Sequence, residues 1–385
     1  MDQEIDRNGP HELAGDMRQL IALDLPGGVD FVQTLQAVWD GGDAAFVLDQ
    51  RLPRPAKGRL LRSMAPAFIV SPDGRDRMRS SRSVDGGDAL VVATSGSTGE
   101  PKGVVLTHAA IEASARATSA RIGVDPADRW LACLPLSHVG GLSVVTRALA
   151  TGTPVTVLPG FDPDAVAASD ATLVSLVPTA LARIDPSRFR VIVLGGSRPP
   201  PDRPANTVTT YGMTETGSGV VYDGRPLDGV DVRIDANGEI HLRGPMLLRS
   251  YRDDHDPKDS DGWFATGDVG SWLDDGRLHV EGRRGEMIIT GGENVWPEAV
   301  ERVLATAPGV DDVAVVGVAD REWGQVVTAL IVVAGGADVH LEGLRDHVKA
   351  ELPAFCAPRR LVVVTDVPRT ALGKVRRGEL DALVQ

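Results

Sequence analysis

Hydrophobic and polar positions in the first part of the chain predict a few separate elements. Apolar residues recur at helical spacing over residues 31–39, where they would form one face of a helix. Short apolar runs at residues 44–48 and 67–70 predict strands. Residues 71–87 are rich in Arg, Ser, Asp and Gly, and this composition predicts a loop. None of these patterns indicates a chemical function.

Further along the chain, apolar runs alternate with helical patterns. The runs that predict strands cover residues 89–92, 104–106, 130–135, 154–158, 172–177 and 191–194. The helical patterns cover residues 108–120 and 140–150, a stretch from residue 163, and residues 180–184. This alternation predicts a largely parallel sheet with helices on its faces. In such sheets ligands collect at the carboxyl ends of the strands.

The pattern changes after residue 230. Residues 230–248 alternate as short strands do in a small antiparallel barrel. The last ~100 residues predict a compact α+β unit, with elements at residues 298–305, 313–318, 326–333, 341–351 and 360–364. The predicted fold class is therefore α/β: a large N-terminal region of α/β sheets plus a small barrel, followed by a small α+β C-terminal domain. We place the boundary so that the two domains comprise residues 1–282 and 283–385.

Composition narrows the classes of function. The chain has 385 residues and a formal net charge of −13, which disfavours a nucleic-acid partner because phosphate backbones need a basic face. The two cysteines, Cys133 and Cys356, are far apart and form no C-x-x-C motif, so neither disulfides nor a thiolate zinc site is expected. The acidic N-terminus is unlike a signal peptide, and no apolar run approaches the ~20 residues that span a bilayer. We expect a soluble protein of a reducing cytoplasm with no membrane insertion.

The strongest local signal is the loop of residues 94–103, TSGSTGEPKG, between two apolar runs. It combines hydroxyl groups, glycines and a lysine, which suits a polyphosphate. The candidate phosphate-binding residues are Thr94, Ser95, Gly96, Ser97, Thr98, Gly99 and Lys102. The loop is not a Walker motif, because Pro101 stands five residues after Gly96 and Lys102 is followed by Gly103. A short Ser-Gly-Ser-Thr-Gly run taken alone is more often a flexible surface turn.

A second group of candidates follows later strands. It consists of Gly195, Gly196, Tyr211, Gly212, Thr214 and Glu215. Tyr211 can stack on a base, Thr214 can bind a phosphate, and Glu215 is a hard oxygen ligand for Mg²⁺. Taken alone, residues 209–217 fit an ordinary Tyr-Gly turn with a solvated glutamate equally well.

Three single residues complete the set of candidates. His138 lies in a strand-to-helix turn beside Gly140 and Gly141, although a lone histidine near apolar residues is more often structural. Asp268 follows a Thr-Gly turn, where aspartate usually caps the backbone. Lys374 lies in a basic tail, where lysine is normally solvated.

These motifs, in this order over residues 89–385, resemble the adenylate-forming superfamily of acyl- and aryl-CoA synthetases, luciferases and nonribosomal adenylation domains. The resemblance implies that residues 94–103 hold the β- and γ-phosphates of ATP. It implies that Tyr211 flanks adenine, with Gly195 and Gly196 as a further wall, and that Glu215 holds Mg²⁺.

The resemblance also assigns the single residues. Asp268 would accept both ribose hydroxyls, and Arg283 would contact ribose and phosphate. His138 would border the pocket of the carboxylic acid substrate. Lys374 matches the adenylation lysine of the motif Pro-x-Thr-x-x-Gly-Lys.

The family reaction has two steps. A carboxylate attacks the α-phosphate of MgATP to give an acyl-adenylate, and the thiol of CoA then displaces AMP. The C-terminal domain would rotate between the steps, withdrawing Lys374 and bringing Gly291 and Gly292 to line a pantetheine channel. The family's charged hinge residue is replaced by Gly285, which absorbs backbone changes but makes no charged contact between domains.

The substrate is less clearly specified. No aspartate occurs within residues 130–142, which argues against an amino acid. The short chain resembles compact o-succinylbenzoate–CoA ligases of menaquinone biosynthesis, whose substrate carries extra carboxylates. Arg147 and Arg198 are candidate cations for them, although either could equally lie at the surface. Open alternatives are a CoA ligase for another small aryl or fatty acid, a module that loads a carrier protein, and a non-catalytic nucleotide binder.

Overall fold

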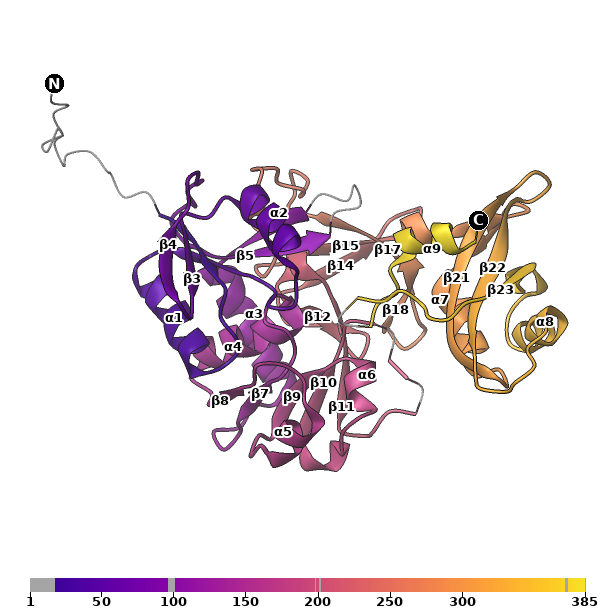
Figure 1. The fold of residues 1–385 in the computed structure, drawn as a ribbon, viewed down its shortest axis with the longest axis horizontal. Coiled ribbons are helices and arrows are strands. Elements are labelled where there is room, and N and C mark those ends of the chain that lie inside the picture. Colours follow the sequence, from indigo (N-terminus) through magenta and orange to yellow (C-terminus); the bar gives the residue numbers. More distant parts are fainter. Residues whose placement is uncertain (1–17, 96–100, 198, 201, 371–372, 385) are drawn as a thin grey trace, which may run out of the picture.

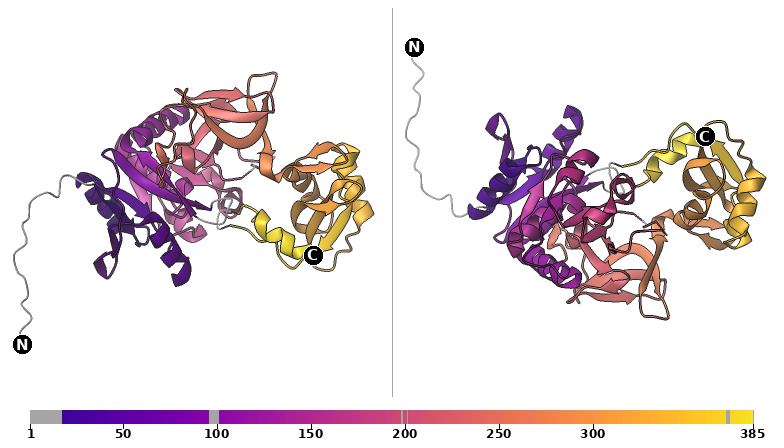
Figure 2. Two further views of the ribbon diagram at one scale, coloured as in Figure 1. Left: turned by 90° about the horizontal axis from the view of Figure 1, so that it is seen from above. Right: turned by 90° about the horizontal axis from the view of Figure 1, so that it is seen from below.

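The structure is a computed structural model that describes residues 18–95, 101–197, 199, 200, 202–370 and 373–384. Figure 1 shows a large part built from the first two thirds of the chain and a smaller lobe that contains the last strands and helices. Figure 2 shows the same two lobes from above and below, joined through a narrow region. Separate clusters of buried apolar side chains fill the large part and the smaller lobe.

The first sheet has the strand order β16-β6-β5-β2-β1-β3-β4. Its strands are β1 (Leu20–Leu23), β2 (Ala44–Val47), β3 (Phe68–Ser71), β4 (Gly74–Arg77), β5 (Asp88–Ser95), β6 (Pro101–Thr107) and β16 (Ser250–Tyr251). Strand β4 lies inside residues 71–87, where we expected only a loop, so that prediction is wrong in part. Its four residues are all exposed at the sheet edge, and their polar composition therefore hid the strand.

The second sheet has the order β13-β12-β11-β10-β9-β7-β8. Its strands are β7 (Trp130–Ala132), β8 (Val155–Val157), β9 (Leu173–Leu176), β10 (Val191–Leu194), β11 (Thr207–Gly212), β12 (Gly219–Tyr222) and β13 (Arg225–Pro226). The strands from β8 to β11 run parallel, as the βα alternation predicted, whereas β12 returns antiparallel to β11. This direction sends the carboxyl ends of the parallel strands to one edge.

Helices cover and separate these sheets. They are α1 (Val29–Asp40), α2 (Arg54–Met64), α3 (His108–Ile122), α4 (Val139–Thr151), α5 (Pro163–Ala168) and α6 (Pro178–Leu181). Helix α3 contacts β6 of the first sheet and β12 of the second, so it lies between them, packed against α4 (Figure 1). The side chain of Thr107 accepts a hydrogen bond from the backbone N–H of Ala110 at 3.1 Å, which caps the start of α3.

The third sheet contains β14 (Asp231–Ile234), β15 (Glu239–Arg243), β17 (Phe264–Trp272) and β18 (Leu278–Arg283), all antiparallel. Their order is β14-β15-β17-β18, so β14 and β18 lie at opposite edges. The predicted small barrel is therefore an open sheet, because four strands are too few to close a cylinder around a packed interior.

The smaller lobe is a mixed sheet with helices against it. Its elements are β19 (Ile288–Thr290), β20 (Glu293–Val295), α7 (Pro297–Leu304), β21 (Val310–Asp320), β22 (Gly324–Val333), α8 (Leu341–Lys349), β23 (Arg360–Val363) and α9 (Arg377–Leu380). The long hairpin β21–β22 forms its centre, and β23 pairs parallel with β22. Across the described residues, no helix is both long and apolar enough to cross a membrane.

Candidate active site

One wall of the site follows the carboxyl end of strand β10. There Gly195 lies so close to the next strand that an added Cβ would come within 2.6 Å of the hydroxyl oxygen of Thr210. Gly196 has a φ of +84°, a conformation that residues with a Cβ rarely adopt. Both glycines are therefore required by the backbone, which leaves an open surface at the edge where parallel sheets bind ligands.

Three side chains meet at the next position along this edge. The hydroxyl of Tyr211 donates to Asp268 Oδ2 at 2.8 Å, and Arg283 Nε lies 3.2 Å from Asp268 Oδ1. Burial raises the pKa of Asp268, against the opposing effects of Arg283, Tyr211 and Lys374. Burial and the neighbouring Asp268 also raise the pKa of Tyr211. The result is a buried carboxylate with a planar ring beside it, which suits a ribose joined to an aromatic base.

Lys374 approaches this carboxylate from the smaller lobe. Its charge acts on Asp268, and the preceding Gly373 lies against Thr179 of the large part. The backbone N–H of Lys374 donates to Thr370 Oγ1 at 3.1 Å. Arg369 donates to the carbonyl of Gly373 at 2.8 Å. The basic tail therefore contains a hydrogen-bonded turn that positions the exposed Lys374 near the site.

A second carboxylate lies on the turn after strand β11. Thr214 and Glu215 begin the short helix Thr214–Thr216, and Tyr251 donates its hydroxyl to Glu215 Oε1 at 3.0 Å. Lys102 Nζ is 5.2 Å from the centre of the Tyr251 ring. Burial and Glu215 raise the pKa of Tyr251, so this ring stays a hydrogen-bond donor. Tyr251 was missed in the sequence, since it belongs to a two-residue strand with no motif of its own.

Gly212 is also required where it lies. An added Cβ there would come within 2.2 Å of the carbonyl oxygen of Ser218. The close approach folds the segment that carries Glu215 back against β12.

The phosphate loop is described only at its two ends. Strands β5 and β6 pair antiparallel there, with Thr94 opposite Lys102 and Ser95 opposite Pro101. The predicted residues Gly96, Ser97, Thr98 and Gly99 lie outside the described residues, as does the candidate cation Arg198. The described ends place the loop between two strands of the first sheet, next to Tyr251 of β16.

His138 lies at the start of α4, beside a large cleft. Its Nε2 is 3.9 Å from Asp49 Oδ2, and Arg51 pairs with the same carboxylate at 2.6 Å. Burial raises the pKa of Asp49, but hydrogen bonds from Arg51 outweigh this effect and hold the pKa at about 2. Burial lowers the pKa of His138, opposed by Asp49, which favours a neutral ring.

The cleft beside His138 has a volume of about 530 Å³. Asp49 and Arg51 line it from the segment after β2, and Arg183 lines it from the segment after α6. We had assigned no function to the first of these segments. The sequence signal that could have indicated this segment is its charged residues directly after a buried parallel strand. The carboxyl ends of parallel strands lie at the edge of the sheet where ligands bind.

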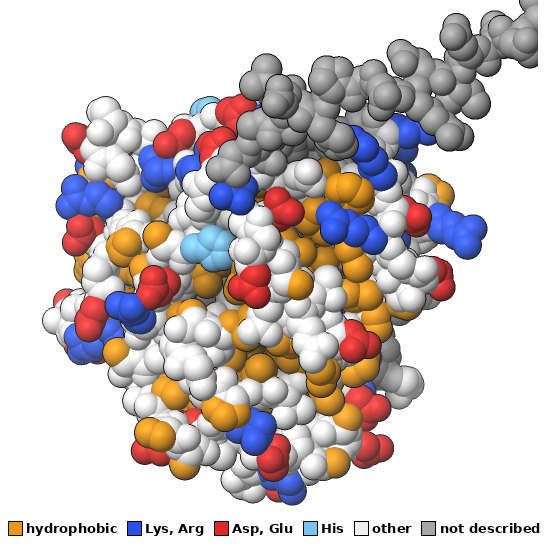
Figure 3. Space-filling model, turned by 90° about the vertical axis from the view of Figure 1, so that its left-hand side faces the viewer, with side chains coloured by type: hydrophobic (Ala, Val, Ile, Leu, Met, Phe, Trp, Pro, Cys, Tyr) orange, Lys and Arg blue, Asp and Glu red, His pale blue; other side chains and the backbone are white. Residues whose placement is uncertain are grey.

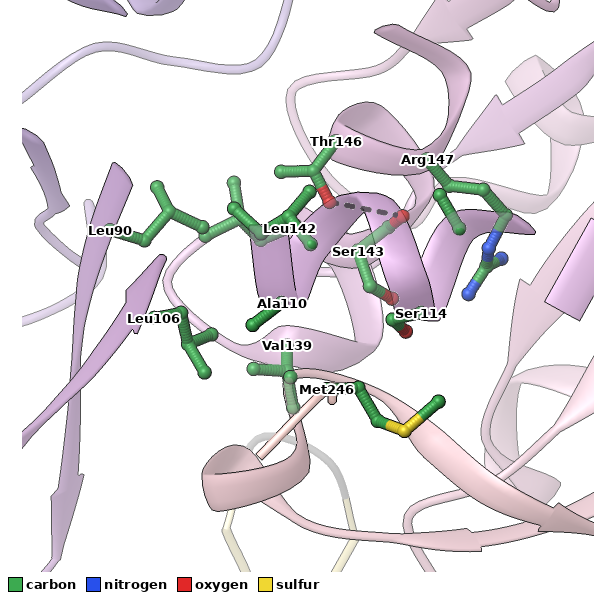
Figure 4. Close-up of a pocket in the computed structure, with 13 residues that line it drawn as sticks. Leu90, Leu106, Ala110, Ser114, Val139, Leu142, Ser143, Thr146, Arg147 and Met246 are labelled. Carbon is green, nitrogen blue, oxygen red and sulfur yellow. Dashed lines mark hydrogen bonds between the residues drawn. The ribbon is translucent and has the colours of Figure 1, made fainter. Parts of the chain in front are cut away.

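Arg147 is buried, and no carboxylate of the described residues pairs with it. It is 2% exposed, and one guanidinium nitrogen donates to Ser218 Oγ at 3.0 Å. Within the part of the chain that the structure describes, its Nε and other terminal nitrogen have no hydrogen-bond partner, and the ring centre of Trp130 lies 4.9 Å from the guanidinium group. Burial lowers the pKa of Arg147. Figure 4 shows it on the same helix as Ser143 and Thr146, beside a small cavity between α3 and α4. The surface interpretation of this arginine is therefore wrong.

Gly291 and Gly292 form the turn between β19 and β20, with φ values of +60° and +85°. Gly291 packs against the ring of Trp323 within the smaller lobe. Their predicted role at a pantetheine channel depends on a movement of this lobe and stays a prediction.

The fold and the gathered residues are those of a candidate enzyme site at the carboxyl ends of parallel strands. The family model of AMP-binding enzymes matches residues 80–252, and that of the AMP-binding enzyme C-terminal domain matches residues 299–374. The chain belongs to the AMP-binding enzyme family, whose members include adenylate-forming CoA ligases.

Several of the similar proteins are named for the same activity. A probable 2-succinylbenzoate–CoA ligase of Mycobacterium tuberculosis is 42% identical over 359 residues, covering 85% of this chain and 93% of that protein. The o-succinylbenzoate CoA synthetase of Bacillus subtilis, solved with its acyl-adenylate intermediate, has a TM-score of 0.84 at 28% identity, covering 94% of this chain and 88% of that chain. The same enzyme with ATP and a magnesium ion gives a TM-score of 0.83 at 28% identity, over 94% and 89% of the two chains.

Proposed function

We propose that this chain is an ATP-dependent carboxylate–CoA ligase that activates o-succinylbenzoate as an acyl-adenylate and transfers it to CoA. The observation that carries the choice of acid is Arg147. A buried guanidinium without a counter-charge is destabilising by several kcal/mol, and this cost falls when a carboxylate pairs with it. o-Succinylbenzoate has two carboxylates, so one can react while the other pairs with Arg147. The assignment places the enzyme in menaquinone biosynthesis.

ATP would bind along the edge formed by the two sheets. Tyr211 offers its ring to adenine, while Asp268 accepts from the ribose hydroxyls. The carboxylate of Glu215, oriented by the hydroxyl of Tyr251, is a hard oxygen ligand that fits Mg²⁺. Bound with ATP, Mg²⁺ neutralises phosphate charge.

Lys374 would stabilise the charge that develops when the carboxylate attacks the α-phosphate. A fixed ammonium group in a site shielded from water lowers the energy of such a transition state more than it would in bulk water. Lys102 would hold the pyrophosphate end, which leaves. Arg283 would hold Asp268 in place beside the nucleotide.

CoA would enter through the cleft lined by Asp49, Arg51 and Arg183, while His138 stays a candidate border of the carboxylic acid pocket. The cleft is large enough for a pantetheine arm, and Arg183 supplies positive charge toward the phosphates of CoA. We further propose that residues 283–385 rotate as a domain against residues 1–282 between the two steps. The movement would withdraw Lys374 and bring Gly291 and Gly292 to the cleft.

The test is a pyrophosphate-release screen of carboxylic acids with ATP and CoA, with thioester products identified by mass spectrometry. We expect o-succinylbenzoate to be the best substrate. A carrier-protein thioester in place of acyl-CoA, or preference for an acid with one carboxylate, would contradict the proposal.

Arg147→Met and Arg147→Lys test the observation directly. We expect Arg147→Met to raise the KM for o-succinylbenzoate at least about tenfold, since a buried charged pair is lost. The KM for ATP should stay within about twofold, and Arg147→Lys should retain part of the affinity because it keeps the charge. An equal rise of the KM for o-succinylbenzoate and for benzoate in Arg147→Met would show that Arg147 does not bind the second carboxylate.

A further inference from the structure

Glu239 begins strand β15 and uses its two carboxylate oxygens for different purposes. Oε1 accepts a hydrogen bond from the backbone N–H of Gly267 at 3.0 Å. Oε2 lies 2.8 Å from a terminal nitrogen of Arg284. The side chain of Glu239 is 14% exposed and that of Arg284 is 49% exposed, so the contact with Gly267 is the more shielded of the two. Neither contact was predicted from the sequence.

The first contact fixes the irregular part of strand β17 that presents Asp268, where the sequence predicts a turn. Gly267 has a φ of +74°, and the N–H of Asp268 is held at 3.0 Å by the hydroxyl of Thr266. Thr266 in turn donates to the carbonyl of Ile240 at 2.7 Å. The carboxylate of Glu239 therefore completes a hydrogen-bonded frame around the residue next to Asp268. A charged acceptor makes this a stronger bond than a neutral one would be.

The second contact fixes the chain where it leaves the large part. Arg284 directly follows Arg283, the last residue of β18, and directly precedes Gly285. At Gly285 an added Cβ would meet no atom within 4 Å, and its φ lies outside the left-handed range. The present arrangement therefore gives no steric reason for a glycine there. Gly285 adds backbone freedom immediately after Arg284, whose side chain is held by Glu239.

We propose that Glu239 is a positioning residue that connects the part of β17 next to Asp268 with Arg284, the residue at which the chain leaves β18 for the smaller lobe. One side chain then holds the ribose carboxylate in place and keeps the movement of the smaller lobe confined to Gly285 and the residues after it. The pair Arg284–Glu239 supplies, one position earlier, the charged contact that Gly285 cannot make. This inference rests on the proposed two-step reaction.

An ordinary surface ion pair is the simpler explanation, and the same sheet contains one. Asp231 and Arg243 pair at 2.8 Å with side chains 60% and 47% exposed. Exposed pairs of this kind contribute little because water and salt screen them. Asp231→Asn is therefore a matched control for Glu239→Gln, since each substitution removes the acidic charge of an ion pair whose arginine is about half exposed.

Three variants separate the two contacts of Glu239. Glu239→Ala removes both contacts, while Arg284→Met removes only the contact with Arg284. Glu239→Gln keeps an oxygen that can accept from Gly267 but loses the charge that faces Arg284. The measurements are the Kd for ATP without acid, ATP–pyrophosphate exchange with o-succinylbenzoate, and thioester formation from presynthesised acyl-adenylate.

We expect the Kd for ATP to rise about tenfold or more in Glu239→Ala. In Glu239→Gln and Arg284→Met it should stay within about threefold of the wild-type value. In those two variants exchange should slow at least about threefold relative to thioester formation, because the arrangement that presents Lys374 is less populated. Asp231→Asn should leave all three measurements within about twofold of wild type.

Two results would overturn the inference. One is an ATP affinity of Glu239→Ala equal to that of Asp231→Asn. The other is an equal loss in both half-reactions accompanied by a lower melting temperature, which a purely structural role predicts. A failure of the proposed substrate is distinguishable, because the wild-type chain would then form no thioester from o-succinylbenzoate while its ATP binding still reports on Glu239.

Discussion

Lys374, the residue proposed to act in the first step, comes from a different lobe than Asp268, the carboxylate that its charge affects. Asp268 and Tyr211 are held by the sheets of the large part, whereas Lys374 depends on Arg369 and Thr370 of the smaller lobe for its position. Because the lysine is exposed and approaches from outside, its removal leaves the nucleotide pocket intact. A single substitution can therefore separate binding from chemistry.

We predict that Lys374→Ala reduces ATP–pyrophosphate exchange at least about a hundredfold, since a charge that stabilises the transition state is lost. The Kd for ATP should change less than about threefold. Thioester formation from presynthesised acyl-adenylate should persist, because Lys374 acts only in the first step. Exchange at the wild-type rate in this variant would show that the lysine has no catalytic role.

At the scale of elements, the site is made where strands end and glycines let segments approach. Strand β10 ends at Gly195 beside Thr210 of β11, and β5 and β6 bracket the phosphate loop. The charged segment after β2 follows the same rule, although it lacks a motif. Position at a strand end is thus a better guide to function in this fold than residue type alone.

We predict that Gly195→Ala lowers kcat/KM about tenfold or more, because the new methyl group must displace the hydroxyl of Thr210 and narrow the pocket. Gly86→Ala is the matched control, since an added Cβ there meets nothing within 4 Å. It should leave kcat/KM unchanged. Steady-state kinetics on both variants would decide, and equal behaviour of the two would contradict a tight wall at Gly195.

At the scale of the whole molecule, the polar contacts that stabilise the second sheet and the proposed active site lie at opposite ends of its strands. Asp128 is 3% exposed and joins the segments that lead into β9 and β10, through Thr172 at 2.6 Å and Arg190 Nε at 2.9 Å. These contacts precede the strands, whereas the active site follows them. On the face in Figure 3, acidic and basic side chains are interspersed, so the net charge of −13 forms no single acidic field there.

We predict that Asp128→Asn destabilises the large part by on the order of 2 kcal/mol at pH 7. Burial raises the pKa of Asp128, but Arg190 and Thr172 outweigh it and lower the pKa to about 2. Because the folded pKa lies below the unfolded one, this stabilisation is complete above about pH 4 and is lost as the pH falls toward 2. Urea unfolding across that range should show a shallower pH dependence in the variant. An unchanged pH dependence would exclude Asp128 as the source.

The sequence by itself determined the fold class, the alternation of strands and helices in the large part and the chemistry of the first reaction step. These follow from local signals: the period of apolar residues, the turn residues and motifs that each lie within about ten residues. It missed strand β1 and helix α2 near the start of the described chain. It did not reveal the edge strand β4, whose residues are all polar and exposed, or the open form of the third sheet.

Only the tertiary structure decided which distant residues share one environment. Arg147 could be surface or pocket until its burial and missing counter-charge were known. Asp49, Tyr251 and Glu239 carry no motif, since each acts through a partner far away in the chain. Burial, desolvation and pairing are properties of the packed molecule, so a linear pattern cannot specify them.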